Sequence, residues 1–276
     1  MQINLRKAMF VLPNLFTVSS IFLGFYSMTL AAGDATPEQL YRAALAIFFA
    51  IFFDMFDGRV ARMTRTQSDF GVQLDSLADV ISFGAAPALL VYKWALAPMG
   101  FLGLFLSFSF AACGALRLAR FNVLSASPKG GPGYFVGLPI PLAALTIVAL
   151  VIANYGMRGA ALHAAAQIPV AALVVFLSLL MVSTVQYRTF KDVRLSPKLI
   201  AGFVAVCAIA GLVAMELHPA WILAALISLY IVLGLVESAV AIGTRFAQRR
   251  AAAGAAGQGP GEAEGEEDGV DSEDFL

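Results

Sequence analysis

Charged residues are scarce in this chain of 276 residues, since lysine, arginine, aspartate and glutamate together make up only 13% of it. Hydrophobic residues make up 60%, and 22 residues are phenylalanine. This balance excludes an ordinary soluble domain, whose surface needs more charge. It is typical of a protein whose helices are embedded in a lipid bilayer.

Cysteine and histidine are also rare, with two residues of each. Cys113 and Cys207 both lie inside apolar runs, which favours buried small side chains over a disulfide or a metal site. His163 and His218 lie in or beside predicted outer loops, and we assign them no chemistry. The start of the chain, Met1–Lys7, is too short for a signal peptide and lacks a cleavage site, so the first apolar run is predicted to be a retained span.

Eight apolar runs are long enough to span a bilayer. They cover about residues 10–31, 39–56, 72–94, 100–121, 136–154, 167–186, 198–215 and 219–243. The sequence therefore predicts an all-α, polytopic membrane helical bundle of about eight transmembrane helices, with one transmembrane domain over residues 1–245. Residues 246–276 turn to alanine and glycine and then to acids, which predicts a disordered cytoplasmic tail because so little of it can be buried.

Basic residues set the predicted orientation of the bundle. With the N-terminus in the cytoplasm, only Arg42, Lys93 and Arg158 of the 18 lysine and arginine residues fall on the outer side. This is the bias of cytoplasmic loops in membrane proteins. An inner loop at about 122–135 is rich in glycine and proline, which suits either a plain linker or a segment that covers a ligand.

The most informative segment is acidic. It reads Asp54-x-x-Asp57-Gly58-x-x-Ala61-Arg62, then eight residues, then Gly71-x-x-x-Asp75-x-x-x-Asp79. On helices, each pair of aspartates projects from one face. Two facing helices would bring four carboxylates together, which requires cations between them. Such oxygen ligands suit Mg²⁺ or Mn²⁺, and two such ions are a common clamp for displacement at phosphorus.

Each residue of this segment also has a simpler interpretation. A single aspartate could form a salt bridge to Arg62 or Arg65 at the membrane surface, although four acids at paired spacing favour the metal site. Gly58 and Ala61 leave room either for a ligand or for a second helix. Arg62 is suited to holding a phosphate, or to anchoring the helix at the inner surface.

The acidic pattern resembles the signature of the CDP-alcohol phosphatidyltransferases, with every fixed position present and a fitting spacer. The resemblance covers about residues 8–190 and thins out afterwards, so spans seven and eight lie beyond it. It implies a six-helix core that dimerises in the membrane. It also implies transfer of a lipid phosphate from a CDP-linked donor to an alcohol, with release of CMP.

The same resemblance implies roles for individual residues. Asp54, Asp57 and Asp75 look like metal ligands, with Asp54 and Asp75 shared by two divalent cations, Mg²⁺ or Mn²⁺. Asp79 looks like both a ligand of the second ion and the catalytic base that deprotonates the acceptor. The residues expected to bind CDP-diacylglycerol are Asn14, Thr17, Gly58, Ala61, Arg62 and Ser68. For Asn14 and Thr17, a helix cap or an interhelical hydrogen bond is the alternative.

Three further patterns are similar to the bacterial membrane-integrated phosphatidylserine synthases within that family. They are Asp79-Val-Ile-Ser82-Phe83-Gly84-x-Ala86-Pro87, Arg117-Leu-Ala-Arg120-Phe121-Asn122 and Phe135-x-Gly137-Leu138-Pro139-x-Pro141. This similarity implies L-serine as the acceptor and a bacterial inner membrane as the location. The bias of the basic residues predicts that the active site faces the cytoplasm. Ser82, Arg117 and Arg120 are candidates for binding the acceptor. Each arginine could instead be an anchor at the inner surface, and Asn122 could cap span four.

Two alternatives remain open. The acceptor could be choline, glycerol phosphate or an inositol compound, although a phosphorylated acceptor would need a denser basic pocket and choline an aromatic cage. The chain could also be a divalent-cation transporter, although the acids cluster at one edge and do not line the bilayer midplane. The expected partners are the lipid bilayer and a second copy of the chain in a homodimer, and nucleic acid is not expected.

Overall fold

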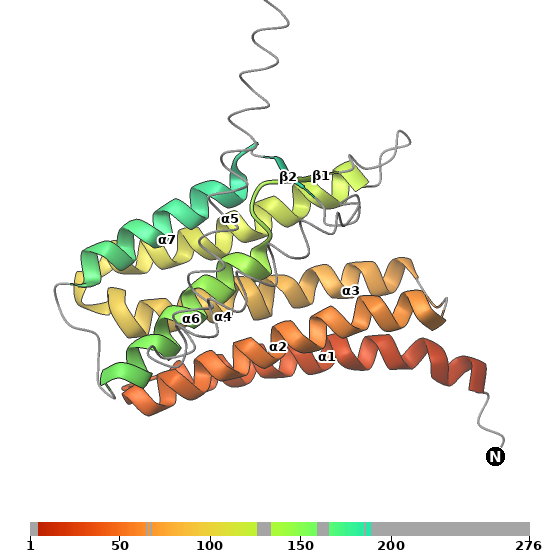
Figure 1. Ribbon diagram of the computed structural model, residues 1–276, viewed down its shortest axis with the longest axis horizontal. Coiled ribbons are helices and arrows are strands. Elements are labelled where there is room, and N and C mark those ends of the chain that lie inside the picture. The colour runs from red at the N-terminus through yellow and green to blue at the C-terminus, as the bar shows by residue number, and fades with distance from the viewer. Residues whose placement is uncertain are drawn as a thin grey trace, which may run out of the picture.

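The computed structural model describes residues 5–64, 66, 68–125, 134–158, 166–184 and 186–188. These residues form a bundle of long helices, so the predicted fold class is confirmed (Figure 1). The elements are α1 (Leu5–Ala31), α2 (Pro37–Thr64), α3 (Asp69–Asp79), η1 (Val80–Ala85), α4 (Ala86–Val91), η2 (Tyr92–Leu96), η3 (Ala97–Met99), α5 (Phe101–Ser125), β1 (Tyr134–Val136), α6 (Ile140–Arg158), α7 (Gln167–Val182) and β2 (Gln186–Arg188). The predicted spans seven and eight, the tail and much of the 122–135 loop lie outside the described residues.

Four helical stretches within the described residues are long and apolar enough to cross a membrane. They are Pro13–Ala31, Asp69–Met99, Phe101–Ser125 and Ile140–Met157. They coincide with the first, third, fourth and fifth predicted runs, so the chain is an integral membrane protein. The second predicted run lies within α2. The sixth run begins with α7, a helix of 16 residues that ends at Val182, before the predicted end of the run.

The third predicted run is one continuous but irregular helix. It starts as α3, passes through the π-helical turn η1 and continues through α4 into the second π-helical turn η2. Pro87 lies in the first turn of α4 and has no N–H to donate. The helix is wider at this point, because the Ala86 N–H donates to the Ile81 carbonyl, five residues back. Such π turns change the direction in which later side chains point.

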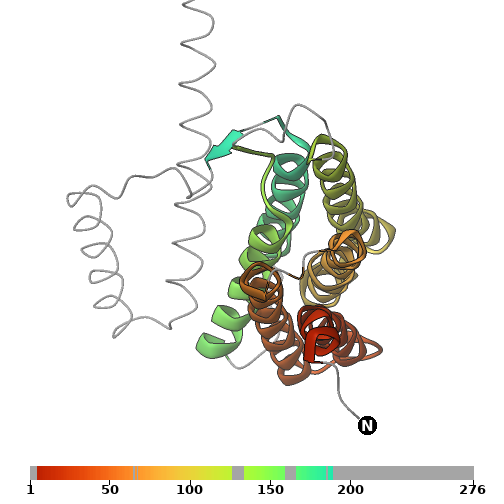
Figure 2. The same ribbon diagram turned by 90° about the vertical axis from the view of Figure 1, so that its right-hand side faces the viewer.

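The helices pack in two groups. α1, α2 and α3 run side by side along the long axis, and α5 packs against α7 on the other side of the bundle (Figures 1 and 2). Small residues allow close packing within the first group, as is common between membrane helices. A Cβ added at Gly24 of α1 would lie 2.8 Å from the Ser82 Cα of η1, so only glycine fits there.

The sequence did not predict the strands β1 and β2. They pair antiparallel, with Phe135 opposite Tyr187. The pair joins the segment before α6 to the segment after α7. Because its residues are about 50 positions apart, no local periodicity indicates the pairing.

Candidate functional site

The four predicted metal ligands come from two helices that face each other. α2 carries Asp54 and Asp57 in its C-terminal half, and α3 carries Asp75 and Asp79. Carboxylate oxygens of Asp54, Asp57 and Asp75 all lie within 4.8 Å of one another. The carboxyl group of Asp79 lies beside that of Asp54. The two pairs are therefore brought to one place, as their spacing predicts.

This acidic cluster contains oxygens that nothing in the described part of the chain satisfies. Asp54 Oδ1 and Asp79 Oδ1 are buried and have no hydrogen-bond partner among the described residues. Carboxylates this close together repel one another, and burial makes their charge costly. A divalent cation would relieve both penalties, because Mg²⁺ and Mn²⁺ bind carboxylate oxygens. The residues present therefore fit a metal site.

Asp57 is held in place from helix α1. Thr17 Oγ1 donates a hydrogen bond to Asp57 Oδ2 at 2.8 Å, and the Pro13 carbonyl lies 3.2 Å from the same hydroxyl. The Gly58 N–H donates to Asp57 Oδ1. Each oxygen of this carboxylate thus has a donor, which fixes its orientation. The interhelical hydrogen bond considered for Thr17 from the sequence is present.

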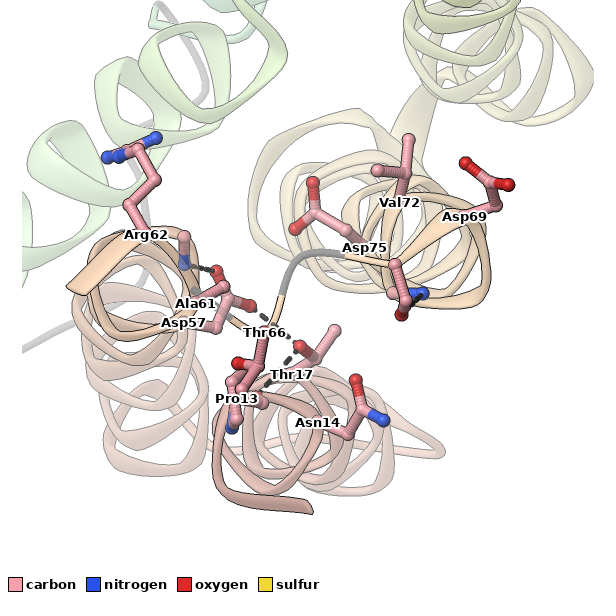
Figure 3. A pocket seen from close by; sticks show the side chains of 13 residues that line it. Pro13, Asn14, Thr17, Asp57, Ala61, Arg62, Thr66, Asp69, Val72 and Asp75 are labelled. Carbon is pink, nitrogen blue, oxygen red and sulfur yellow. Dashed lines mark hydrogen bonds between the residues drawn. The ribbon is translucent and has the colours of Figure 1, made fainter. Parts of the chain in front are cut away.

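A cavity of about 420 Å³ lies beside the acids, between α1, the end of α2 and the start of α3 (Figure 3). Asp57 and Asp75 border it from two different helices (Figure 3). Its lining residues are Pro13, Asn14, Thr17, Asp57, Gly58, Ala61, Arg62, Thr66, Ser68, Asp69, Gly71, Val72 and Asp75. The cavity therefore combines carboxylates, hydroxyls, an amide and a guanidinium in one concave space.

All six residues expected to bind CDP-diacylglycerol line this cavity: Asn14, Thr17, Gly58, Ala61, Arg62 and Ser68. A Cβ added at Gly58 would lie 3.8 Å from Arg62 Nη1, an ordinary van der Waals distance, so the two residues lie side by side on α2. Ser68 also caps α3, because its hydroxyl accepts from the Gly71 N–H at 3.1 Å. The placement of these residues agrees with the prediction, although their roles stay predictions.

Sequence reasoning missed three lining residues, Thr66, Asp69 and Val72. They lie between or beside the two halves of the acidic pattern. The Thr66 N–H donates to the Ala61 carbonyl at 3.0 Å, which folds the α2–α3 connection over the cavity. The short spacer could have indicated this, because the connection between two facing helices must pass close to their shared site.

Ser82 is not among the residues that line the cavity. Its side chain is fully buried, and its hydroxyl donates to the Ser20 carbonyl of α1 at 2.9 Å. In a regular α-helix Ser82 would share a face with Asp79, because three residues make nearly one turn. The π-helical turn η1 begins at Val80 and breaks this periodicity, so Ser82 packs η1 against α1.

The two candidate arginines on α5 have different surroundings. Arg117 is only 5% exposed and lies close enough to Asp79 for direct charge–charge attraction. Its guanidinium carbon lies 5.5 Å from the centre of the Phe121 ring. Arg120 instead donates to main-chain carbonyls at the end of α7. Of the three predicted acceptor-binding residues, only Arg117 is placed beside the acids.

Asn122 makes a hydrogen bond between two helices. Its Nδ2 donates to Ser76 Oγ at 2.9 Å, and Ser76 in turn donates to the Val72 carbonyl. Ser76 lies on α3 between Asp75 and Asp79. Asn122 therefore ties the C-terminal end of α5 to the helix that carries two of the four acids.

Comparisons with known proteins agree with this geometry. Residues 10–180 match the model of the family described as CDP-alcohol phosphatidyltransferase. A CDP-diacylglycerol–serine O-phosphatidyltransferase of Helicobacter pylori is 37% identical over 229 residues, which are 83% of this chain and 91% of the relative. The Bacillus subtilis protein of the same name is 35% identical over 50% of this chain and 74% of its own length. An archaetidylserine synthase of Methanothermobacter thermautotrophicus is 35% identical over 64% of this chain and 69% of its own length.

Proposed function

The chain belongs to the CDP-alcohol phosphatidyltransferase family, and on this premise we propose that it transfers the phosphatidyl group of CDP-diacylglycerol to the hydroxyl of L-serine. The products are phosphatidylserine and CMP. The observation that carries this proposal is the cluster of four aspartates beside a cavity of about 420 Å³ at one end of the bundle. The names of relatives that align over most of this chain support serine as the acceptor.

The cavity residues are suited to the nucleotide end of the donor. Arg62 supplies a guanidinium for a phosphate group, and Asn14 and Thr17 supply polar groups on the opposite wall. Gly58 and Ala61 leave the α2 backbone accessible to a flat ligand. The donor's acyl chains remain in the bilayer, where apolar side chains of α1 such as Phe22 and Phe25 are exposed.

Asp54, Asp57 and Asp75 would hold two divalent cations, Mg²⁺ or Mn²⁺, with Asp79 as a ligand of the second. When bound, such ions neutralise the charge that develops on the diphosphate and on the departing CMP. The unpartnered Oδ1 atoms of Asp54 and Asp79 support this assignment. The hydrogen bond from Thr17 keeps the Asp57 carboxylate oriented toward the proposed metal site.

Asp79 is assigned as the general base. It takes the proton of the serine hydroxyl as that oxygen attacks the phosphorus attached to diacylglycerol, and the bond from phosphorus to CMP breaks. Arg117 lies beside Asp79 and has a buried Nε without a hydrogen-bond partner among the described residues. A guanidinium in this position is suited to the carboxylate of serine.

The proposed location of this site is the cytoplasmic face of a bacterial inner membrane, where a water-soluble acceptor can reach it, and the distribution of basic residues supports this orientation. Lys93 lies at the opposite end of the bundle, where its Nζ donates to the Gly33 carbonyl between α1 and α2. A homodimer within the membrane is part of the same proposal.

The proposal is tested with purified protein in detergent, given CDP-diacylglycerol and Mg²⁺ or Mn²⁺. CMP release is measured with L-serine, choline, glycerol 3-phosphate and inositol, each added separately. Release with L-serine alone supports the proposal. Release with another alcohol is consistent with the proposed role of the four aspartates but contradicts serine as the acceptor. No release with any of these alcohols contradicts the transferase activity itself.

A further inference from the structure

The two terminal nitrogens of the Arg120 guanidinium form a fork of hydrogen bonds to the last carbonyls of helix α7. Its Nη1 donates to the Val182 carbonyl at 2.8 Å, and its Nη2 donates to the Ser183 carbonyl at 2.9 Å and lies 3.4 Å from the Met181 carbonyl. The last carbonyls of a helix have no partner within it and carry partial negative charge. A guanidinium can satisfy several of them at once because its donors are planar and divergent, which a lysine ammonium cannot match.

The segment that leads into α6 packs against the end of α7 and Arg120, and these three parts form one junction. The Leu138 N–H donates to the Leu180 carbonyl at 3.1 Å, next to the carbonyls that Arg120 holds. Gly137 has a φ of 78°, which favours glycine. A Cβ added there would lie 2.9 Å from Arg120 Nη2 and would collide with the Met181 carbonyl. The strand pair β1–β2 continues from this point.

The same end of α5 carries Arg117, one helical turn before Arg120. Arg117 is buried beside Asp79 on the acid side, while Arg120 holds α7. On the acid side, Asn122 ties α5 to α3 through Ser76. The C-terminal end of α5 is therefore attached both to α3, through Asn122, and to α7, through Arg120. The position of Arg117 depends on both attachments.

We propose that Arg120 is a positioning residue for the acceptor: its fork on α7 fixes the C-terminal end of α5 so that Arg117 faces Asp79, and Arg120 itself does not bind serine. This proposal rests on the proposed function for its kinetic part. It changes the role predicted for Arg120 from the sequence. It also gives Gly137 a role, because only glycine leaves room for the fork.

The kinetic test compares Arg120→Lys, which keeps the charge but cannot make the fork, with Gly137→Ala, which crowds the fork from the other side. Arg42→Lys is the matched control, because Arg42 is an exposed arginine that pairs with Glu38 at 2.6 Å. We expect both junction variants to raise the KM for serine about tenfold, the cost of one lost hydrogen bond to a charged group. The KM for CDP-diacylglycerol should stay within about twofold of the wild-type value in both variants, because the donor cavity is untouched.

Two outcomes of this test contradict the proposal. If Arg120→Lys raises the KM for serine but a folded Gly137→Ala does not, Arg120 contacts the acceptor directly. If both variants lower kcat and leave the KM for serine unchanged, the junction has only a structural role.

A second measurement needs no activity and remains informative if Gly137→Ala does not fold. Spin labels are placed at two exposed positions, Val123→Cys on α5 and Leu179→Cys on α7, with Cys113 and Cys207 replaced by alanine. Arg120→Lys should broaden the distribution of distances between the labels, and Arg42→Lys should leave it unchanged. An unchanged distribution in Arg120→Lys would overturn the proposal. Because no substrate is present, this result is independent of whether serine is the acceptor.

Discussion

Thr17 on α1 and Asp57 on α2 are joined by a hydrogen bond of 2.8 Å between the threonine hydroxyl and one carboxylate oxygen. This bond connects the first helix to the acidic cluster across 40 residues of sequence. It couples the wall of the cavity to a predicted metal ligand, since both residues line the same space. The cavity and the acids therefore form one site.

We expect Thr17→Val, which keeps the shape but removes the donor, to weaken metal binding. A hydrogen bond to a charged group contributes about 1.5–3 kcal/mol, so the Mn²⁺ concentration for half-maximal CMP release should rise at least about tenfold. Ser19→Ala is the control, because the Ser19 hydroxyl donates to the Leu15 carbonyl of its own helix on an exposed face. Equal metal dependence in Thr17→Val and Ser19→Ala would contradict a role for Thr17 in orienting Asp57.

We expect Asp79→Asn to lower kcat by about 10²–10⁴, the usual contribution of a general base. Asp69→Asn is the matched control, because Asp69 is an exposed acid of the same helix that also lines the cavity. It should change kcat by less than about threefold, since Asp69 is not part of the four-acid cluster. Turnover is measured at saturating CDP-diacylglycerol, serine and metal. Normal turnover of Asp79→Asn would exclude Asp79 as the base.

We expect Arg117→Gln to raise the KM for serine about a hundredfold, because a charged partner of the serine carboxylate is lost. The KM for CDP-diacylglycerol should change little, since Arg117 does not line the donor cavity. Initial rates over a matrix of both substrate concentrations separate the two constants. A rise confined to the KM for CDP-diacylglycerol would assign Arg117 to the donor instead.

Asn122 and Ser76 should behave as a coupled pair. Asn122→Ala and Ser76→Ala remove the same hydrogen bond, so the double variant should lose little more kcat than either single variant. Each single variant should also lower the free energy of unfolding by about 1 kcal/mol. Fully additive losses in the double-mutant cycle would show that the two side chains act independently.

The four acids and the cavity residues could be placed from the sequence because their spacing follows regular α-helices. Ser82 could not be placed in this way, since the π-helical turn after Asp79 interrupts the regular spacing and the Ser82 hydroxyl donates to the Ser20 carbonyl. Arg120 could not be interpreted from local spacing either, because its acceptors are carbonyls about 60 residues further along the chain. The strand pair β1–β2 depends on the same long-range junction.

We expect phosphatidyl transfer to depend on divalent cations held by the acidic cluster. The most direct measurement strips the protein of metal with a chelator, then follows Mn²⁺ binding by electron paramagnetic resonance and CMP release in the same titration. Wild-type protein should bind Mn²⁺ and recover serine-dependent CMP release in parallel, whereas Asp54→Asn should lose both. Undiminished CMP release in the presence of excess chelator, or normal Mn²⁺ binding by Asp54→Asn, would contradict this account.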